Sequence, residues 1–166
     1  QTKYKTFVIS GTNQPNKIRG LVNLLKLNKI EFGFLSSNKS KSVKNAYEYL
    51  TGEKKTIKVS NKDICIPIDQ KLGILANVLF EPKTNLSDTL TYDITAWSLP
   101  YIYGLDAYAL ENNLKLELKD ALPFKSLELK IDKNSYGYLS KWGTINDLKF
   151  LAEILNHRVT VRVAEK

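Results

Sequence analysis

The sequence has no methionine, a single histidine, His157, and a single cysteine, Cys65. Because a nascent chain begins with methionine, we expect this one to be a processed product or a piece excised from a longer polypeptide. One cysteine cannot form an internal disulfide bond. A catalytic zinc site normally takes three protein ligands, usually with two histidines or a cysteine and histidine mixture among them. We therefore expect no metal, no other cofactor and no catalytic residue in this chain.

Arginine is also scarce, since only three of the 25 basic residues are arginine and the other 22 are lysine. The net charge is +8, and residues 1–62 alone carry +10. Such a basic region could meet nucleic acid, anionic lipid or an acidic partner, or it could be a solvated lysine-rich surface. Specific reading of bases relies on the bidentate arginine fork. We therefore do not expect nucleic acid to be a partner.

Long apolar runs are absent, and none approaches the ~20 residues that a membrane-spanning helix needs. We expect no membrane span. Hydrophobic residues make up 43% of the chain and charged residues 25%, as in ordinary globular proteins. Because 166 residues suit one domain, residues 1–166 are predicted to form a single domain.

The first half of the chain alternates between strand and helix patterns. The predicted strands are residues 4–10, 30–35, 43–50, 56–59 and 64–68, with the third and fourth forming a hairpin. A helix begins at Pro15, whose missing N–H costs nothing in a first turn. Its buried face is predicted from the spacing of Ile18, Leu21, Val22 and Leu25. A second helix ends before Pro82, and its predicted face is Leu72, Leu75, Ala76 and Leu79.

The second half begins with a turn-rich stretch, residues 84–110, which we predict to be irregular apart from a short helix over 94–99. Further predicted strands are residues 114–118, 127–131, 136–142 and 159–163. Thr144 caps a helix, with Asp147 placed as in a capping box. The predicted buried face of this helix is Ile145, Leu148, Leu151, Ala152 and Leu155.

Residues 4–35 and 136–165 show the same order of strand, Gly-Thr turn, helix and strand. We interpret them as two βαβ-like units in one sheet, with right-handed crossovers if their strands are parallel. The predicted fold class is α/β, with a mixed, partly parallel sheet and flanking helices, as in flavodoxin-like proteins.

Three residues form a candidate anion site, Gly11, Thr12 and Asn13, because they lie between a strand and a helix N-terminus. The phosphate-loop patterns Gly-x-x-x-x-Gly-Lys and Gly-x-Gly-x-x-Gly are missing, so an ordinary turn is the alternative. Cys65 lies between two isoleucines in a predicted strand, which favours a buried thiol over a nucleophile. His157 lies at a helix end, which favours a capping or surface role.

Aromatic residues are concentrated in residues 92–108, which hold five of the 17. Tyrosine and tryptophan dominate the energetics of many interfaces, although core packing is the alternative. The candidate docking or binding surface consists of Tyr92, Asp93, Trp97, Tyr101 and Tyr103.

The same stretch carries a resemblance to a known family. Residues 79–110, LFEPKTNLSDTLTYDITAWSLPYIYGLDAYAL, resemble a segment downstream of the peptidase domain in large bacterial zinc carboxypeptidases of the carboxypeptidase A-like family. IPIDQ at 66–70 and YGYLSKWGTINDLKFLAEIL at 136–155 are similar to the same region. The family holds zinc with a His-x-x-Glu pair and a distant histidine, and neither is present here.

The resemblance implies a non-catalytic accessory domain whose partner is the peptidase domain of the same polypeptide, upstream of Gln1. Zinc would belong to that peptidase domain, the fold would be similar to class I glutamine amidotransferases, and the location would be periplasmic or extracellular. Two alternatives remain open. One is a module that binds a small molecule or peptide at the C-terminal ends of its strands, and the other is a degenerate hydrolase that uses Cys65.

Overall fold

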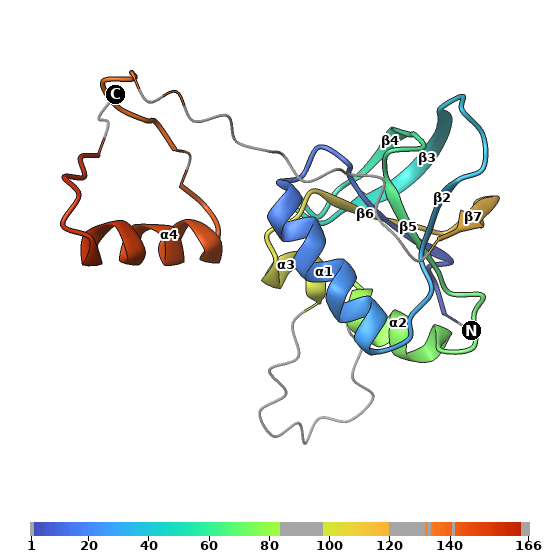
Figure 1. Ribbon diagram of the computed structural model, residues 1–166. Coiled ribbons are helices and arrows are strands. Elements are labelled where there is room, and N and C mark those ends of the chain that lie inside the picture. Colours follow the sequence, from blue (N-terminus) through green and yellow to red (C-terminus); the bar gives the residue numbers. More distant parts are fainter. Residues whose placement is uncertain (1, 84–97, 120–131, 133, 141, 164–166) are drawn as a thin grey trace. The chain divides into compact units, whose positions relative to one another are not determined.

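The computed structural model describes residues 2–83, 98–119, 132, 134–140 and 142–163. Its contacts divide the chain into two units, residues 1–123 and 124–166, which are treated separately below. Among the described residues, the first unit contains a sheet with three helices, and the second contains one helix, α4 (Ile145–Asn156) (Figure 1).

The first unit is built on a seven-stranded sheet in the order β4-β3-β6-β1-β5-β2-β7. The strands are β1 (Thr6–Ile9), β2 (Gly33–Leu35), β3 (Lys41–Glu48), β4 (Lys54–Val59), β5 (Ile64–Pro67), β6 (Ala107–Leu110) and β7 (Leu116–Leu118). Every pairing between them is antiparallel. The prediction of a mixed, partly parallel, flavodoxin-like α/β sheet is therefore wrong, and the fold is mainly β.

The error comes from one inserted strand. Helix α1 (Pro15–Leu27) connects β1 to β2 as predicted. Both strands pair with β5, which lies between them and is antiparallel to each, so β1 and β2 run in the same direction without touching. This is a split βαβ arrangement. Local periodicity detects the crossover helix, but it cannot show that a strand from residues 64–67 enters the gap.

The second predicted βαβ unit is wrong in its strands and right in its helix. Helix α4 is present, and Thr144 caps it in a capping box with Asp147, as predicted. Residues 136–140, 142 and 159–163 are not strands. Tyr136 and Val163 are almost fully exposed. Alternating apolar residues form a strand only where a partner strand accepts their hydrogen bonds, so the sequence pattern alone was not sufficient here. The predicted strand over 127–131 lies outside the described residues.

Sequence reasoning also missed β6, which lies between β3 and β1. Its residues, Ala-Tyr-Ala-Leu, are short and carry two alanines, a residue depleted in strands. The small side chains suit a crowded position, because Ala109 pairs with Phe7 on one side and Tyr47 on the other.

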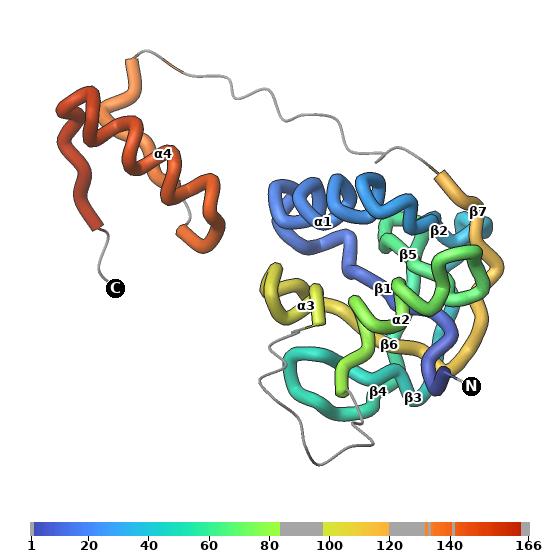
Figure 2. The backbone as a smooth tube through the Cα atoms, turned by 90° about the horizontal axis from the view of Figure 1, so that it is seen from below, coloured from blue at the N-terminus to red at the C-terminus, as the bar shows by residue number. Residues whose placement is uncertain are grey.

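One face of the sheet is covered by helices α1, α2 (Gly73–Phe80) and α3 (Leu99–Ile102) (Figures 1 and 2). The residues that α1 buries are the four predicted, Ile18, Leu21, Val22 and Leu25. From α2, Phe80 stacks on Phe7 of β1, with ring centroids 5.5 Å apart. This layer forms the main hydrophobic core, as expected for a sheet that buries one face against helices.

The other face of the sheet is also buried, because the β3–β4 hairpin contributes apolar side chains to it. Their cluster comprises Val8, Val43, Ala46, Ile57, Val59, Cys65 and Leu110. The predicted hairpin is confirmed, and Gly52 at φ +74° forms part of its turn. Positive φ strains most other residues, so this position favours glycine.

Candidate functional site

The turn after β1 contains the predicted anion site, and protein acceptors engage all three of its backbone N–H groups. Gly11 N–H donates to Asp63 Oδ1 at 2.8 Å, Thr12 N–H to Ser10 Oγ at 3.3 Å, and Asn13 N–H to the Ser10 carbonyl at 3.2 Å. A carboxylate of the chain itself thus accepts from Gly11. The arrangement favours an ordinary connecting turn over a ligand site.

Asn13 joins this turn to the start of β6. Its Nδ2 donates to the Asp106 carbonyl at 2.9 Å, and its Oδ1 accepts from the Asp106 N–H at 2.9 Å. A Cβ on Gly11 would lie 2.4 Å from the Lys62 carbonyl oxygen, so this position tolerates no side chain. Gly11 and Asn13 therefore hold β1, β5 and β6 in register, which explains the Gly-Thr-Asn pattern structurally.

Cys65 is a buried thiol and His157 is a capping residue on the surface, as predicted. Cys65 is fully buried in β5, where burial raises the pKa of its thiol to about 12. A thiol with that pKa carries almost no nucleophilic thiolate at neutral pH, which counts against the Cys65 hydrolase. His157 is the C-cap of α4, and its Nε2 lies 3.3 Å from Glu153 Oε1 on the surface.

The predicted docking segment is only partly described. Tyr92, Asp93 and Trp97 lie outside the described residues. Tyr101 is 38% exposed and packs its ring edge against Tyr49, with centroids 5.2 Å apart. Tyr103 packs closely on α1, because its ring lies 3.1 Å from the Cβ position of Gly20. These two tyrosines thus anchor α3, and Tyr101 also presents surface.

Helix α2 has an exposed apolar face that the predicted helix face did not identify. The prediction was Leu72, Leu75, Ala76 and Leu79, whereas the buried residues are Gly73, Ala76 and Phe80. A Cβ on Gly73 would lie 1.9 Å from the Ile68 carbonyl oxygen, so this glycine sets the close approach of the helix. Ile74, Leu75 and Val78 point outward, and Ile74 is 83% exposed. We call Ile74, Leu75, Val78, Tyr101 and Ile102 the α2–α3 patch.

Tyr101 of this patch belongs to a chain of ring contacts with three further tyrosines, Tyr49, Tyr47 and Tyr4. The Tyr49 hydroxyl donates to the Phe80 carbonyl. Burial raises the pKa of Tyr4, with Tyr47 and Glu111 adding to the shift. Burial and the hydrogen bond with Tyr47 raise the pKa of Tyr101 to about 12. The Tyr4 and Tyr101 hydroxyls are therefore protonated at neutral pH and can donate hydrogen bonds.

A cleft of about 770 Å³ opens over Tyr4 and Tyr47. Its charged lining residues are Lys3, Lys54, Glu81 and Lys83, and we call it the lysine cleft. Lys54 Nζ pairs with Glu111 Oε1 at 3.0 Å, and Lys3 Nζ lies 5.3 Å from the centre of the Tyr4 ring. Sequence reasoning missed this site, because its lysines are up to 80 positions apart and only the basic excess of residues 1–62 hints at it.

A smaller hollow of about 270 Å³ lies where β1 ends, and Ser10, Asp63, Lys58 and Tyr108 are among its lining residues. Its position corresponds to the alternative prediction of a ligand that binds at the C-terminal ends of the strands. Ligand pockets typically span ~300–1,000 Å³, so this hollow lies at their lower limit. The lysine cleft is the larger of the two.

Among the described residues, no group of three histidine, cysteine, aspartate or glutamate side chains could hold a metal ion. In the same part of the chain, no helix has the length and apolar character to cross a membrane. Comparisons of the chain with models of protein families, with curated proteins and with solved structures found no match. The resemblance to zinc carboxypeptidases thus remains an expectation.

Proposed function

We propose that this chain is a non-catalytic accessory domain that docks on the peptidase domain of a zinc carboxypeptidase-like polypeptide. Zinc and the hydrolysis of peptide bonds belong to that peptidase domain. This chain contributes surface, through the α2–α3 patch. The proposal combines the family resemblance of residues 79–110 with the exposed apolar side chains that the structure adds.

The main observation behind this proposal is that α2 is apolar on nearly all sides but is covered on only one. A helix that is hydrophobic all round is normally buried. Here Ile74 and Val78 are 83% and 55% exposed, while Phe80 is fully buried. Ile102, on the neighbouring helix α3, is 61% exposed. Contiguous apolar surface of this kind marks interaction sites in soluble proteins.

A tethered partner suits this patch. Interfaces between domains of one chain typically bury ~600–1,500 Å² and are fairly polar. Tethering gives an effective concentration near the ~mM range for short flexible linkers, so even a weak interface forms. The docking is therefore expected to act in cis.

The first test is the complete reading frame of the gene. An upstream His-x-x-Glu pair followed by a distant histidine supports the proposal, and an upstream region without them rejects the carboxypeptidase assignment. The second test produces the upstream region and this chain as separate polypeptides. Isothermal titration calorimetry then measures their association.

The variants separate the patch from the rest of the surface. Ile74→Gln with Val78→Gln replaces two exposed apolar side chains, and we expect association to weaken at least about tenfold. The matched control is Leu27→Gln, because Leu27 is 83% exposed at the end of another helix, α1. If both proteins bind equally well, or if the unmodified chains do not associate, docking through α2 and α3 is wrong.

A further inference from the structure

We propose that the lysine cleft binds an acidic oligopeptide segment, an extended chain that carries several carboxylates. This inference concerns a site separate from the α2–α3 patch and does not depend on the docking proposal. It rests on the charges, the hydrogen-bond donors and the shape of the cleft.

The rim of the cleft presents ammonium groups from three separate segments of the chain. Lys3 precedes β1, Lys54 begins β4, and Lys83 follows α2. Because these segments are distant in sequence, only the fold brings their charges around one opening. Ammonium groups spread around an opening can each pair with a different carboxylate of one extended chain, through charge-assisted hydrogen bonds.

Acidic groups near the cleft reduce its charge without reversing it. Glu81 lines the cleft, and Asn77 Nδ2 donates to its Oε2 at 3.1 Å. Glu111 pairs with Lys54, and this hydrogen bond, together with the charges of Lys54 and Lys3, lowers the pKa of its carboxyl group. Three ammonium groups therefore face two carboxylates, and Lys83 adds the remaining positive charge beside the opening.

The floor of the cleft favours a peptide over an inorganic anion. Tyr4 and Tyr47 are 8% and 7% exposed, so their rings form a largely buried floor. Tyrosine combines an apolar ring with a hydroxyl, which suits contact with side chains and with backbone carbonyls. A volume of about 770 Å³ holds a few residues and far exceeds the size of one phosphate ion.

A solvated lysine surface is the competing explanation, and a direct binding measurement separates the two. The probe is a fluorescein-labelled hexapeptide of alternating glutamate and tyrosine, titrated with the full chain and followed by fluorescence anisotropy. We expect saturable binding that weakens as ionic strength rises from about 0.05 to about 0.3 M, since salt screens exposed charges. A hexapeptide of alternating lysine and tyrosine should not bind.

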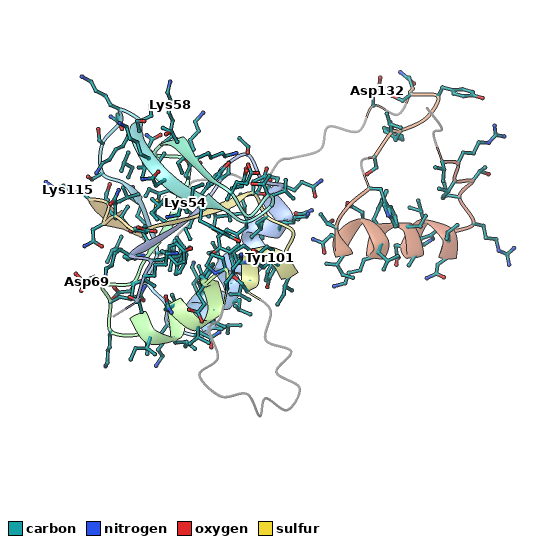
Figure 3. The ribbon with its side chains drawn as sticks, turned by 180° about the vertical axis from the view of Figure 1, so that it is seen from behind. Lys54, Lys58, Asp69, Tyr101, Lys115 and Asp132 are labelled. Atoms are coloured by element: carbon teal, nitrogen blue, oxygen red, sulfur yellow. The ribbon has the colours of Figure 1, made fainter. Side chains whose placement is uncertain are left out.

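Variants test the place of binding. Lys3→Glu with Lys83→Glu reverses two rim charges and should weaken binding at least about tenfold. Lys58→Glu with Lys115→Glu also reverses two charges, at exposed sites outside the cleft that are labelled in Figure 3, and should change binding less than about twofold. Equal weakening by both proteins would mean diffuse charge attraction and would reject the cleft.

A map on the unmodified protein keeps the proposal testable even if a variant misfolds. Amide ¹H–¹⁵N spectra with the acidic peptide should shift at Gly52 and Asn77, which line the cleft, and not at Gly137. Tighter binding of polygalacturonate, or displacement by equimolar inorganic phosphate, would overturn the peptide assignment. Ile74→Gln with Val78→Gln should keep peptide binding intact, so this site and the docking patch can fail independently.

Discussion

Helices α1 and α4 carry similar apolar stripes, but they differ in how much of the stripe is buried. All four predicted core residues of α1 are buried, whereas α4 buries none of its residues within the described part of the chain. Their N-termini show the reverse difference, in side-chain capping. Helix α1 begins without a side-chain cap, and α4 begins with a complete capping box. Helix α1 therefore depends on tertiary packing, while α4 depends on local interactions.

This difference extends to the regions around the two helices. The first unit buries aromatic and aliphatic side chains on both faces of its sheet, and it contains the one cysteine. In the second unit, Leu148 and Leu155 are half exposed, and His157 lies on the surface. Substitutions should therefore cost far more free energy of unfolding in the first unit than in the second.

The largest expected effect concerns the reactivity of Cys65. Native protein should react with a thiol reagent at least about a thousandfold more slowly than protein in denaturant, because a core strand opens only by extensive unfolding. Folding raises the pKa of the Cys65 thiol from 9.0 to about 12. Between these pH values the thiol ionises in the unfolded chain before it ionises in the folded one, so the free energy of unfolding falls as pH rises. Rapid native labelling at pH 7 would show that β5 is not a core strand.

The next largest effect compares one leucine from each helix. Leu21→Ala should lower the free energy of unfolding by roughly 2–5 kcal/mol, because Leu21 is fully buried. Leu151→Ala should lower it by less than about 1 kcal/mol, because α4 buries no side chain. Urea unfolding measures both. Equal losses would mean that α4 packs against an apolar partner.

A pair of glycines gives a smaller contrast. Gly73→Ala should destabilise the chain by roughly 1–3 kcal/mol, because its Cβ would overlap the Ile68 carbonyl oxygen and push the start of α2 away from the loop that precedes it. Gly137→Ala should change stability by less than about 0.5 kcal/mol, because nothing lies within 4 Å of its Cβ position. Thermal unfolding followed by circular dichroism distinguishes them. If Gly73→Ala left the midpoint of thermal unfolding unchanged, the position of α2 described above would be wrong.

The smallest expected effect is confined to α4. Thr144→Ala removes the side chain that accepts from the Asp147 N–H, which should cost about 1 kcal/mol of helix stability. Hydrogen exchange should become faster at the α4 amides and stay unchanged in α1. Thr144→Ser keeps a capping hydroxyl and serves as the control. Faster exchange in both helices would mean that the two units unfold together.

Several features of the fold were predictable because they depend on neighbours in sequence. The face of α1, the β3–β4 hairpin and the α4 capping box follow from spacing and turn chemistry, and all are confirmed. The position of β5 between β1 and β2 was not predictable, because pairing partners are chosen over long range. β6 was missed since its alanines carry little strand signal. Of the candidate docking residues, Tyr101 and Tyr103 fall within the described part of the chain.

The amino-acid sequence by itself determined the positions of α1, α4 and the β3–β4 hairpin, that Cys65 would be a buried thiol, and that residues 1–62 would be basic. Those properties depend on local periodicity and on composition. Only the tertiary structure decided that the sheet is antiparallel, that α2 leaves Ile74 and Val78 exposed, and that Lys3, Lys54 and Lys83 surround one cleft. Such properties depend on contacts between distant segments, whose choice is governed by the packing of the whole sheet.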